Sequence, residues 1–290
     1  MGFPPGSVQD ISARIIVGPL SRSLGKSVIV EDKPGASGTI AAAAVAKATD
    51  GYTFGVMTNS QLTIAKLLDP AIGSNPATDP LPGALVATTP LVFVVSNAAT
   101  GTTSAQWIDW LQSLGARANF GSPGVDTPRH LGMELIRGRS GALVRSHIPY
   151  PGNPQVITAM LAGQVQAALL PPGLGMQQVR AGKMKALGVT SEQRSLLAPE
   201  VPSLREIGSV GVDMELFTAM AGPVTTPSAI QDKLGSVVIE AVKASETRQR
   251  LVNAGWQPDA STADSLRSRT LGETRRLGGI IIMCKITSDA

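Results

Sequence analysis

The stretch Leu91-Val92-Phe93-Val94-Val95 decides the fold class of this chain. All five side chains are apolar, and the last four are β-branched or aromatic. A strand with one face in water alternates apolar and polar residues, whereas a continuous apolar run is typical of a strand covered on both faces. We therefore predict that this run is a strand in the centre of a sheet.

Helices and strands are predicted to alternate on both sides of this run, which indicates an α/β protein with mostly parallel sheets. The box Ser7-Val8-Gln9-Asp10 predicts the start of a helix over residues 7–24, and Gly25 its stop. The other predicted helices cover residues 39–48, 105–114, 156–161 and 230–244, and one begins near Thr127-Pro128. The other predicted strands cover residues 28–30, 52–57, 118–121, 166–170, 185–189 and 217–223.

The composition excludes several classes of protein. The chain has 290 residues, a formal net charge of +4 and 3% aromatic residues. Its Lys and Arg residues are scattered and few rings could stack on bases, which disfavours a nucleic-acid-binding protein. A single cysteine, Cys284, excludes an internal disulfide, and His130 and His147 are the only histidines, so no cluster has metal-ligand spacing. We expect no metal site and no cofactor.

Proline- and glycine-rich loops lead directly into predicted helices at four places. They are Pro4-Pro5-Gly6-Ser7, Pro34-Gly35-Ala36-Ser37-Gly38, Gly121-Ser122-Pro123-Gly124 and Tyr150-Pro151-Gly152-Asn153-Pro154. In the last loop Asn153 is expected to be the N-cap. The first N–H groups of a helix lack intrahelical partners and lie at the positive end of its dipole, so such junctions can bind carboxylate or phosphate. Each loop could also serve only as a turn, but four together favour an anion receptor.

An enzymatic interpretation finds little support in the residues. The chain has no Gly-x-Ser-x-Gly elbow and no Gly-x-x-x-x-Gly-Lys-Ser/Thr phosphate loop. His130 lies in a predicted first helical turn and is expected to be an exposed residue near the helix cap, and His147 is expected to be structural. The carboxylates are dispersed, with Asp10 explained by capping. We therefore predict no catalytic residue.

Seven segments, in order along nearly the whole chain, resemble those of the receptors of tripartite tricarboxylate transporters, also called the Bug family. The first, Phe3-Pro4-Pro5-Gly6-Ser7-Val8-Gln9-Asp10 through Ala13-Arg14, is similar to the family's Phe/Tyr-Pro-Pro-Gly-Gly-x-x-Asp-x-x-Ala-Arg start. The others lie at residues 31–38, 45–53, 120–131, 147–152, 161–165 and 185–203. They include His147-Ile148-Pro149-Tyr150-Pro151-Gly152, which resembles His-Val-Pro-Tyr-x-Gly.

The resemblance implies a type II periplasmic-binding-protein fold, with two α/β lobes joined by two crossover strands and a ligand cleft between the lobes. The expected lobes comprise residues 1–98 with 221–290, and residues 99–220, since the Thr/Ser/Gly-rich stretch at 97–104 reads as a linker. The protein is then expected to be a periplasmic receptor for a small carboxylate. Its partners would be the permease subunits, and closure around the ligand would present the receptor to them.

The resemblance also implies the ligand-binding residues. Two loops would grip a carboxylate through backbone amides and water, and two further segments occupy positions where family members touch ligand. The expected residues are Pro5, Gly6, Ser7 and Val8, then Tyr150, Pro151 and Gly152, and finally Thr58, Asn59, Ser60, Ser122 and Gly124.

Two departures from the family pattern carry expectations of their own. The chain begins at the Pro-Pro-Gly loop, without the strand and signal peptide that normally precede it, which suggests that they were removed or truncated. Leu170 stands where the family usually has Asp. If this side chain faces the ligand, the far end of the pocket is apolar, which favours an extended dicarboxylate or an aromatic carboxylate.

Three alternatives remain open from the sequence. A LysR-type effector domain shares the expected fold, but no helix-turn-helix segment precedes Phe3. An enzyme that acts on a carboxylate would turn its ligand over. A truncated paralogue without binding function would unfold with poor cooperativity.

Overall fold

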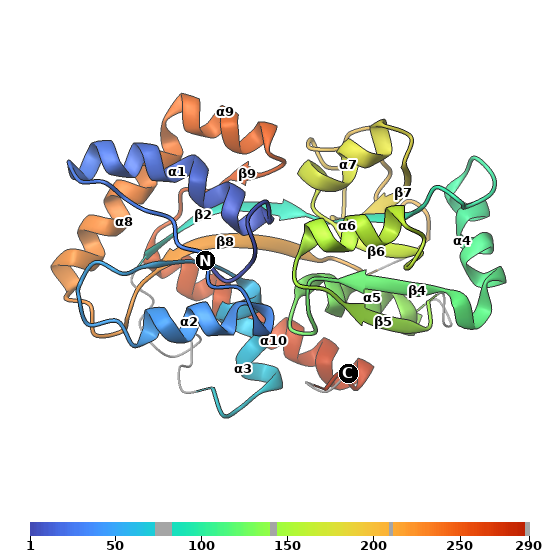
Figure 1. The fold of residues 1–290 in the computed structure, drawn as a ribbon, viewed down its shortest axis with the longest axis horizontal. Coiled ribbons are helices and arrows are strands. Elements are labelled where there is room, and N and C mark those ends of the chain that lie inside the picture. Colours follow the sequence, from blue (N-terminus) through green and yellow to red (C-terminus); the bar gives the residue numbers. More distant parts are fainter. Residues whose placement is uncertain (73–82, 140–143, 209–210, 288–290) are drawn as a thin grey trace. The chain divides into compact units, whose positions relative to one another are not determined.

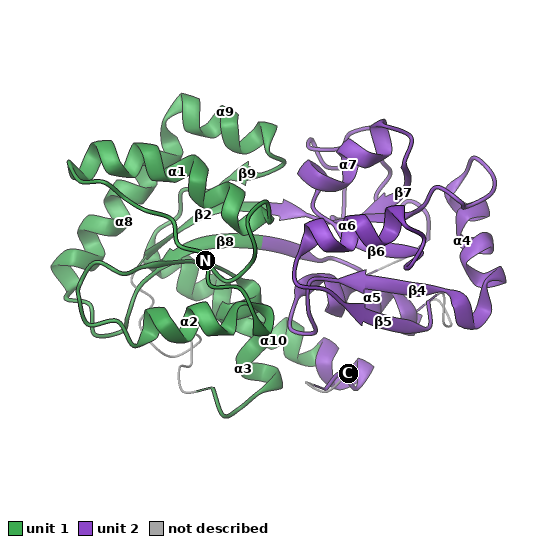
Figure 2. Cartoon of the chain, viewed as in Figure 1, with its two compact units in different colours: residues 1–88, 217–279 green, residues 89–216, 280–290 purple. Residues whose placement is uncertain are grey.

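The computed structural model describes residues 1–72, 83–139, 144–208 and 211–287, which form two compact units (Figure 1). Unit 1 comprises residues 1–88 and 217–279, and unit 2 comprises residues 89–216 and 280–290 (Figure 2). The chain therefore passes from one unit to the other three times. The passages fall within strand β2 (Gly83–Pro90), strand β8 (Glu215–Ala221) and helix α10 (Ala263–Cys284).

These boundaries differ from those expected from the sequence. The stretch at residues 97–104 lies inside unit 2, because the strand before it, β3 (Val92–Ser96), pairs with two other strands of that unit. The end of α10 also belongs to unit 2, whereas the sequence assigned the whole C-terminal segment to the first lobe.

Unit 1 is built on a sheet with the strand order β1-β8-β2-β9. Its further elements are α1 (Val8–Leu24), α2 (Thr39–Ala46), β1 (Gly55–Thr58), α3 (Ala65–Leu68), α8 (Ser228–Lys243), α9 (Ser245–Asn253) and β9 (Gln257–Pro258), with a 3-10 turn at Ala36–Gly38 and a π-helical turn at Ser60–Ile64. Strand β1 is antiparallel to β8, and β2 is antiparallel to β9.

Unit 2 is built on a sheet with the strand order β5-β4-β6-β3-β7. Its elements besides β3 are α4 (Ser104–Ser113), β4 (Asn119–Ser122), α5 (Pro128–Arg139), β5 (Ser146–Pro149), α6 (Asn153–Leu161), β6 (Ala167–Leu170), α7 (Pro172–Arg180) and β7 (Met184–Val189), with a 3-10 turn at Gly115–Arg117. Strand β4 is parallel to β5 and β6, whereas β3 is antiparallel to β6 and β7.

The expectation of mostly parallel sheets was therefore wrong outside β4, β5 and β6. These three strands follow one another through single helices, α5 and α6, and such β-α-β connections give parallel neighbours. Strands β3 and β8 enter their sheets from other parts of the chain. No crossover helix fixes their direction relative to the strands they join.

Strand β3 confirms the central strand predicted from its apolar run. It pairs on both sides, and Val92, Phe93, Val94 and Val95 are all at most 2% exposed. Val92 and Val94 pack in a cluster with side chains of α6 and α7, among them Val156 and Met176. A strand buried on both faces has no position at which a polar side chain would reach water, which explains the continuous apolar run.

The strand predicted at residues 28–30 does not form. No strand in the described part of the chain pairs with it, and Ile29 is 86% exposed. These three residues are β-branched, but without a neighbouring strand their backbone N–H and C=O groups have no sheet partners to bond with. The predicted first helix is confirmed as α1, with Ser7 as its N-cap and Gly25 in the left-handed region at its end. In the described ranges, no helix combines the length and the apolar character needed to cross a lipid bilayer.

Candidate functional site

In unit 1, the loop before α1 is held by the box that the sequence predicted. The Ser7 Oγ accepts a hydrogen bond from the Asp10 N–H at 3.3 Å, and the Asp10 carboxylate accepts one from the Gly6 N–H at 2.9 Å. The Ser7 N–H donates to the Pro4 carbonyl at 3.1 Å. Pro5 has no N–H, so Val8 is the one predicted ligand residue of this loop whose backbone N–H has no acceptor among the described residues.

Two buried glutamines connect this loop with the rest of unit 1. The Gln9 side chain accepts from the Gly2 N–H at 3.0 Å and donates to the Val56 carbonyl at 2.6 Å. The Gln61 Oε1 accepts from the N–H and the hydroxyl of Thr58, and its Nε2 donates to the Ser37 carbonyl at 2.7 Å. The amide groups of Gln9 and Gln61 are themselves 3.5 Å apart. This glutamine network joins the N-terminal segment, strand β1 and the 3-10 turn at Ala36–Gly38 to one another.

Gly38 shows how closely the network is packed. Its φ of 92° lies in the left-handed region, and a Cβ there would come within 2.0 Å of the Gln61 Nε2. Only glycine combines this backbone conformation with such an approach.

The predicted ligand residues lie at the end of β1, with Thr58 as its last residue and Asn59 and Ser60 directly after it, and all three are almost fully buried. The Thr58 hydroxyl is engaged by Gln61, and the Asn59 Nδ2 donates to the Glu273 Oε2 at 3.1 Å. The Ser60 Oγ is buried and has no partner among the described residues. Ser60 is therefore the member of this group whose hydroxyl makes no hydrogen bond within the described part of the chain.

In unit 2, the carboxyl ends of β4, β5 and β6 lie at one edge of the sheet. The register pairs Ser122, the last residue of β4, with Pro149, the last residue of β5, and Gly121 with Ala168 of β6. Each strand then leads through a short loop into a helix, α5, α6 or α7, so three helix N-termini start from this edge. In open α/β sheets this is the edge at which ligands bind.

The predicted residues of unit 2 are brought together at this edge. The Tyr150 N–H donates to the Ser122 carbonyl at 2.8 Å, which joins the loop after β4 to the loop after β5. The Ser122 Oγ donates to the Gly124 carbonyl at 2.8 Å. Gly152 is the N-cap of α6, and Pro151 precedes it.

Asn153 is the first residue of α6 rather than its N-cap, which corrects the sequence prediction. The extended backbone of Gly152 occupies the cap position and leaves the Asn153 side chain on the helix. Asn153 is 1% exposed, and its Oδ1 has no partner in the described part of the chain.

His130 and His147 stack on one another, with ring centroids 4.0 Å apart. The His130 Nδ1 donates to the Val125 carbonyl at 2.5 Å, and the His147 Nε2 is 2.7 Å from the Ser122 Oγ. Burial lowers the pKa of His130 to about 4 and that of His147 to about 3, so both rings are neutral at pH 7. His130 is 1% exposed, so the expectation of an exposed histidine was wrong, because its ring stacks on His147, which in turn stacks on Phe120.

The first turn of α5 carries a buried arginine. The Thr127 hydroxyl caps the helix by accepting the His130 N–H at 3.3 Å. Arg129, two residues further, is 1% exposed, and its Nε and Nη1 have no hydrogen-bond partner in the described ranges. Burial lowers the pKa of Arg129 to about 9, and no neighbouring acid counteracts this shift. The group is still a cation at pH 7.

Leu170 does not present a free surface. It is fully buried in the core cluster of unit 2, and the Cβ built on Gly175 of α7 would lie 3.1 Å from the Leu170 Cβ. Alternate residues of a strand point to opposite faces, and Leu170 points toward α7 while Leu169 points toward Gly132 of α5. The expected contact of Leu170 with the ligand is therefore not supported by its packing.

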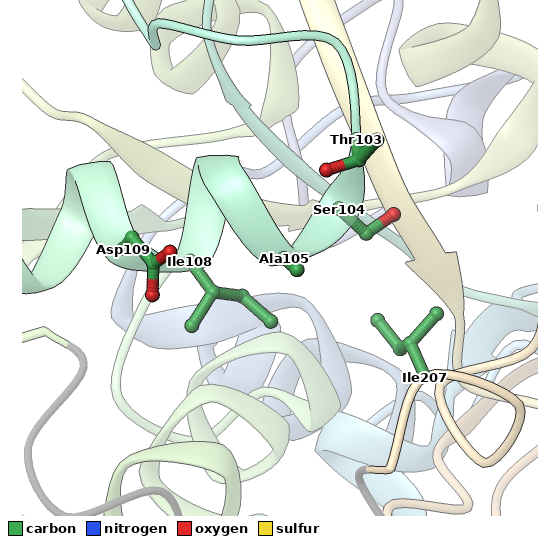
Figure 3. Close-up of a pocket in the computed structure, with 6 residues that line it drawn as sticks. All are labelled: Thr103, Ser104, Ala105, Ile108, Asp109 and Ile207. Carbon is green, nitrogen blue, oxygen red and sulfur yellow. The ribbon is translucent and has the colours of Figure 1, made fainter.

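A cavity of about 450 Å³ lies beside α4, away from these loops (Figure 3). It is lined by Thr103, Ser104, Ala105, Ile108, Asp109 and Ile207. Thr103 is occupied in a capping box, and the Ser104 hydroxyl donates to the Leu187 carbonyl at 3.0 Å. None of the predicted ligand residues lines this cavity. Among the described residues no three His, Cys, Asp or Glu side chains are grouped closely enough to hold a metal ion.

The sequence reasoning missed Gln9, Gln61, Asn153 as a ligand candidate, and Arg129. One sequence feature did point to Arg129. Helix N-termini favour acidic residues, because the helix dipole is positive there, and Thr127-Pro128-Arg129 puts a cation at that end. The glutamines carried no comparable pattern, since polar residues on a helix are usually exposed.

Comparison with known proteins gives one family. Residues 12–285 match the family model of the tripartite tricarboxylate transporter family receptor. A protein of Bordetella pertussis from the UPF0065 group is 31% identical over 281 residues, which cover 96% of this chain and 86% of that protein.

Two solved structures extend the comparison to bound ligands. Rpa4515 of R. palustris, solved with adipate, is 25% identical with a TM-score of 0.92, covering 99% of this chain and 96% of that one. MatC (Rpa3494) from Rhodopseudomonas palustris, solved with bound malate, is 25% identical with a TM-score of 0.87, covering 97% and 96%.

Proposed function

The chain belongs to the tripartite tricarboxylate transporter receptor family, and we propose that it is an extracytoplasmic receptor that binds a small carboxylate and delivers it to the permease of such a transporter. Receptors of this kind act in the periplasm, so we propose that location for this chain. Binding would favour a closed form that the permease recognises.

One observation carries the proposal most directly. The loops after β4 and β5 meet at one edge of the unit 2 sheet and lead into the N-termini of α5 and α6. The backbone N–H groups of Gly152 and Asn153 have no acceptors among the described residues. Free N–H groups at the positive ends of helices are suited to a carboxylate.

We propose a dicarboxylate as the ligand. Malate and adipate, bound by the two solved relatives, both carry two carboxylates. The sequence argument for an extended dicarboxylate or an aromatic carboxylate depended on an apolar wall formed by Leu170, and that side chain packs in the core. The choice of a dicarboxylate therefore rests on the ligands of the two solved relatives.

Reversible binding without catalysis fits the chemistry of the one nucleophile–base pair in the described part of this edge. The Ser122 Oγ and the His147 Nε2 are 2.7 Å apart, as in a hydrolase. However, a pKa of about 3 makes His147 a very weak base, and its Nδ1 has no orienting carboxylate. The Ser122 proton is also engaged by the Gly124 carbonyl.

A thermal-shift screen tests the proposal. The purified chain would be refolded to remove carried-over ligand and then mixed with mono-, di- and tricarboxylates, aromatic acids and amino acids. A micromolar ligand at millimolar concentration should add about 4 kcal/mol to the free energy of unfolding. A cooperative melt that no acid shifts would contradict the proposal, and turnover of a bound acid would point to an enzyme.

A further inference from the structure

Arg129 is a cation for which the described residues offer no counter-ion. Its side chain is buried, and neither Nε nor Nη1 donates a hydrogen bond to a residue that the structure describes. The buried acid of the same helix, Glu134, is already paired with Arg137 and lies 3.8 Å from His130. Leaving a guanidinium buried and unpaired is costly, because it loses its hydration and gains no opposite charge.

The position of Arg129 in α5 adds to this cost. It is the second residue of the helix, after Pro128, so it lies at the positive end of the helix dipole. The Arg129 N–H, like that of Thr127, has no acceptor among the described residues. Backbone and side chain therefore present positive potential at the same place.

The position of Arg129 in α5 places it close to the edge where the loops meet. Helical side chains lean toward the N-terminus, and α5 begins just beyond the carboxyl end of β4. Gly132, one turn later on the same side of α5, packs against Leu169 of β6, and a Cβ there would come within 2.5 Å of the Leu169 Cδ1. Arg129 therefore lies on the side of α5 that faces the sheet, one turn closer to this edge.

We propose that Arg129 is a specificity-determining residue that pairs with a second anionic group of the ligand. This inference rests on the proposed carboxylate receptor. The first carboxylate would be held at the Tyr150–Gly152 loop, and the second group would be bound by Arg129 together with the N-terminus of α5. Because β4 and β5 are neighbouring strands, both helix N-termini start from the same edge of the sheet, α5 on the face of Leu169 and α6 on the face of Leu170. One short dianionic molecule that crosses this edge could reach both N-termini.

The test compares diacids with their half-amides, which have nearly the same shape but carry one charge. Refolded wild-type protein would be titrated calorimetrically with diacids from malonate to adipate, and then with the half-amide of the tightest one. We expect the diacid to bind about 10- to 100-fold more tightly, which is the usual effect of a buried charge-assisted contact. Arg129→Met should lose this preference and bind both compounds about as weakly as the wild type binds the half-amide.

Two variants separate this role from a structural one. Arg129→Lys keeps the charge and should retain part of the preference. Arg180→Met removes an exposed arginine of α7 that pairs with Glu200, and should leave affinity and preference unchanged. The ligand-free Arg129→Met protein should melt at a higher temperature than the wild type, by about 2–8 °C, because it no longer buries an unpaired cation.

The outcomes are distinguishable. If the wild type binds a diacid and Arg129→Met keeps the same preference over the half-amide, the role of Arg129 is wrong and the receptor function stands. If Arg129→Met melts at a lower temperature without ligand and keeps the preference, Arg129 has a structural role and the inference is overturned. If the wild type binds no carboxylate at all, the proposed function fails and this inference fails with it.

Discussion

The two units hold their candidate ligand loops in different ways. In unit 1 the amides of Gln9 and Gln61 connect the N-terminal segment, strand β1 and the 3-10 turn, and their hydrogen bonds are satisfied within the unit. In unit 2 a neutral histidine pair supports the loop after β4, while Arg129 and Asn153 keep buried polar atoms without partners among the described residues. Unit 1 thus uses its buried glutamines for rigidity, although its Ser60 Oγ also lacks a partner in the described ranges. We propose that the unpaired polar groups of unit 2 serve a ligand.

The largest effect should come from acid, through the histidines of unit 2. In the folded protein the pKa is about 4 for His130 and about 3 for His147, and both values lie below the unfolded value of 6.5. The unfolded chain therefore binds more protons below pH 6.5, and stability should be complete above that pH and fall by about 1.4 kcal/mol per pH unit for each histidine down to about pH 4. Denaturant unfolding between pH 7 and 4 measures this slope.

The matched control for the acid effect is the double variant His130→Phe with His147→Phe. It keeps aromatic stacking but cannot be protonated, so its slope should be much flatter. Burial raises the pKa of the nearby Glu134 carboxyl, which acts in the opposite direction and reduces the net loss in both proteins. An equal slope in the double variant would show that other groups control the acid sensitivity.

Gln61→Leu should destabilise the ligand-free protein by about 3 kcal/mol. It leaves the Thr58 N–H, the Thr58 hydroxyl and the Ser37 carbonyl without the glutamine, and each buried group left unpaired costs about 1–3 kcal/mol. Urea unfolding gives the difference. The exposed Gln249→Leu on α9 is the control and should change stability by less than about 0.5 kcal/mol.

Ser7→Ala should lower the free energy of unfolding by about 1 kcal/mol, because the Ser7 Oγ caps α1 by accepting the Asp10 N–H and alanine cannot. Ser7→Asp, which can cap in the same way, should restore most of the loss in urea unfolding. A loss of stability that Asp does not restore would indicate that Ser7 acts through packing and not through the cap.

Asn153→Leu should have the smallest effect on the ligand-free protein, with unfolding free energy unchanged or raised by less than about 1 kcal/mol. The amide of Asn153 has a buried Oδ1 without a partner in the described ranges, so an apolar side chain of similar size removes a desolvation cost. The same amide-to-leucine exchange at Gln61 should instead lower the free energy of unfolding. If urea unfolding showed a large loss of stability for Asn153→Leu, the contrast between a satisfied amide in unit 1 and an unsatisfied amide in unit 2 would be wrong.

Much of the local structure followed from the sequence because its causes are local. The Ser7–Asp10 box, the Gly25 stop and the apolar run of β3 each depend on neighbouring residues, and the structure contains all three. The family also followed from ordered motifs, and the match over residues 12–285 confirms it. The strand at residues 28–30 failed because a strand needs a partner, which no local pattern supplies.

Strand direction, side-chain orientation and pairing were decided only by the tertiary structure. Leu170 stood at a position where the family has a polar residue, but its direction depended on which face of β6 packs on α7. The sequence placed an arginine at the start of a helix. Its burial without a counter-ion among the described residues depends on α5 packing against β6, a contact between segments that are far apart in the chain. The sequence alone thus determined most helices and strands, the loops before the helices and the family. Packing decided strand direction and which polar groups remain unpaired, because both depend on distant segments.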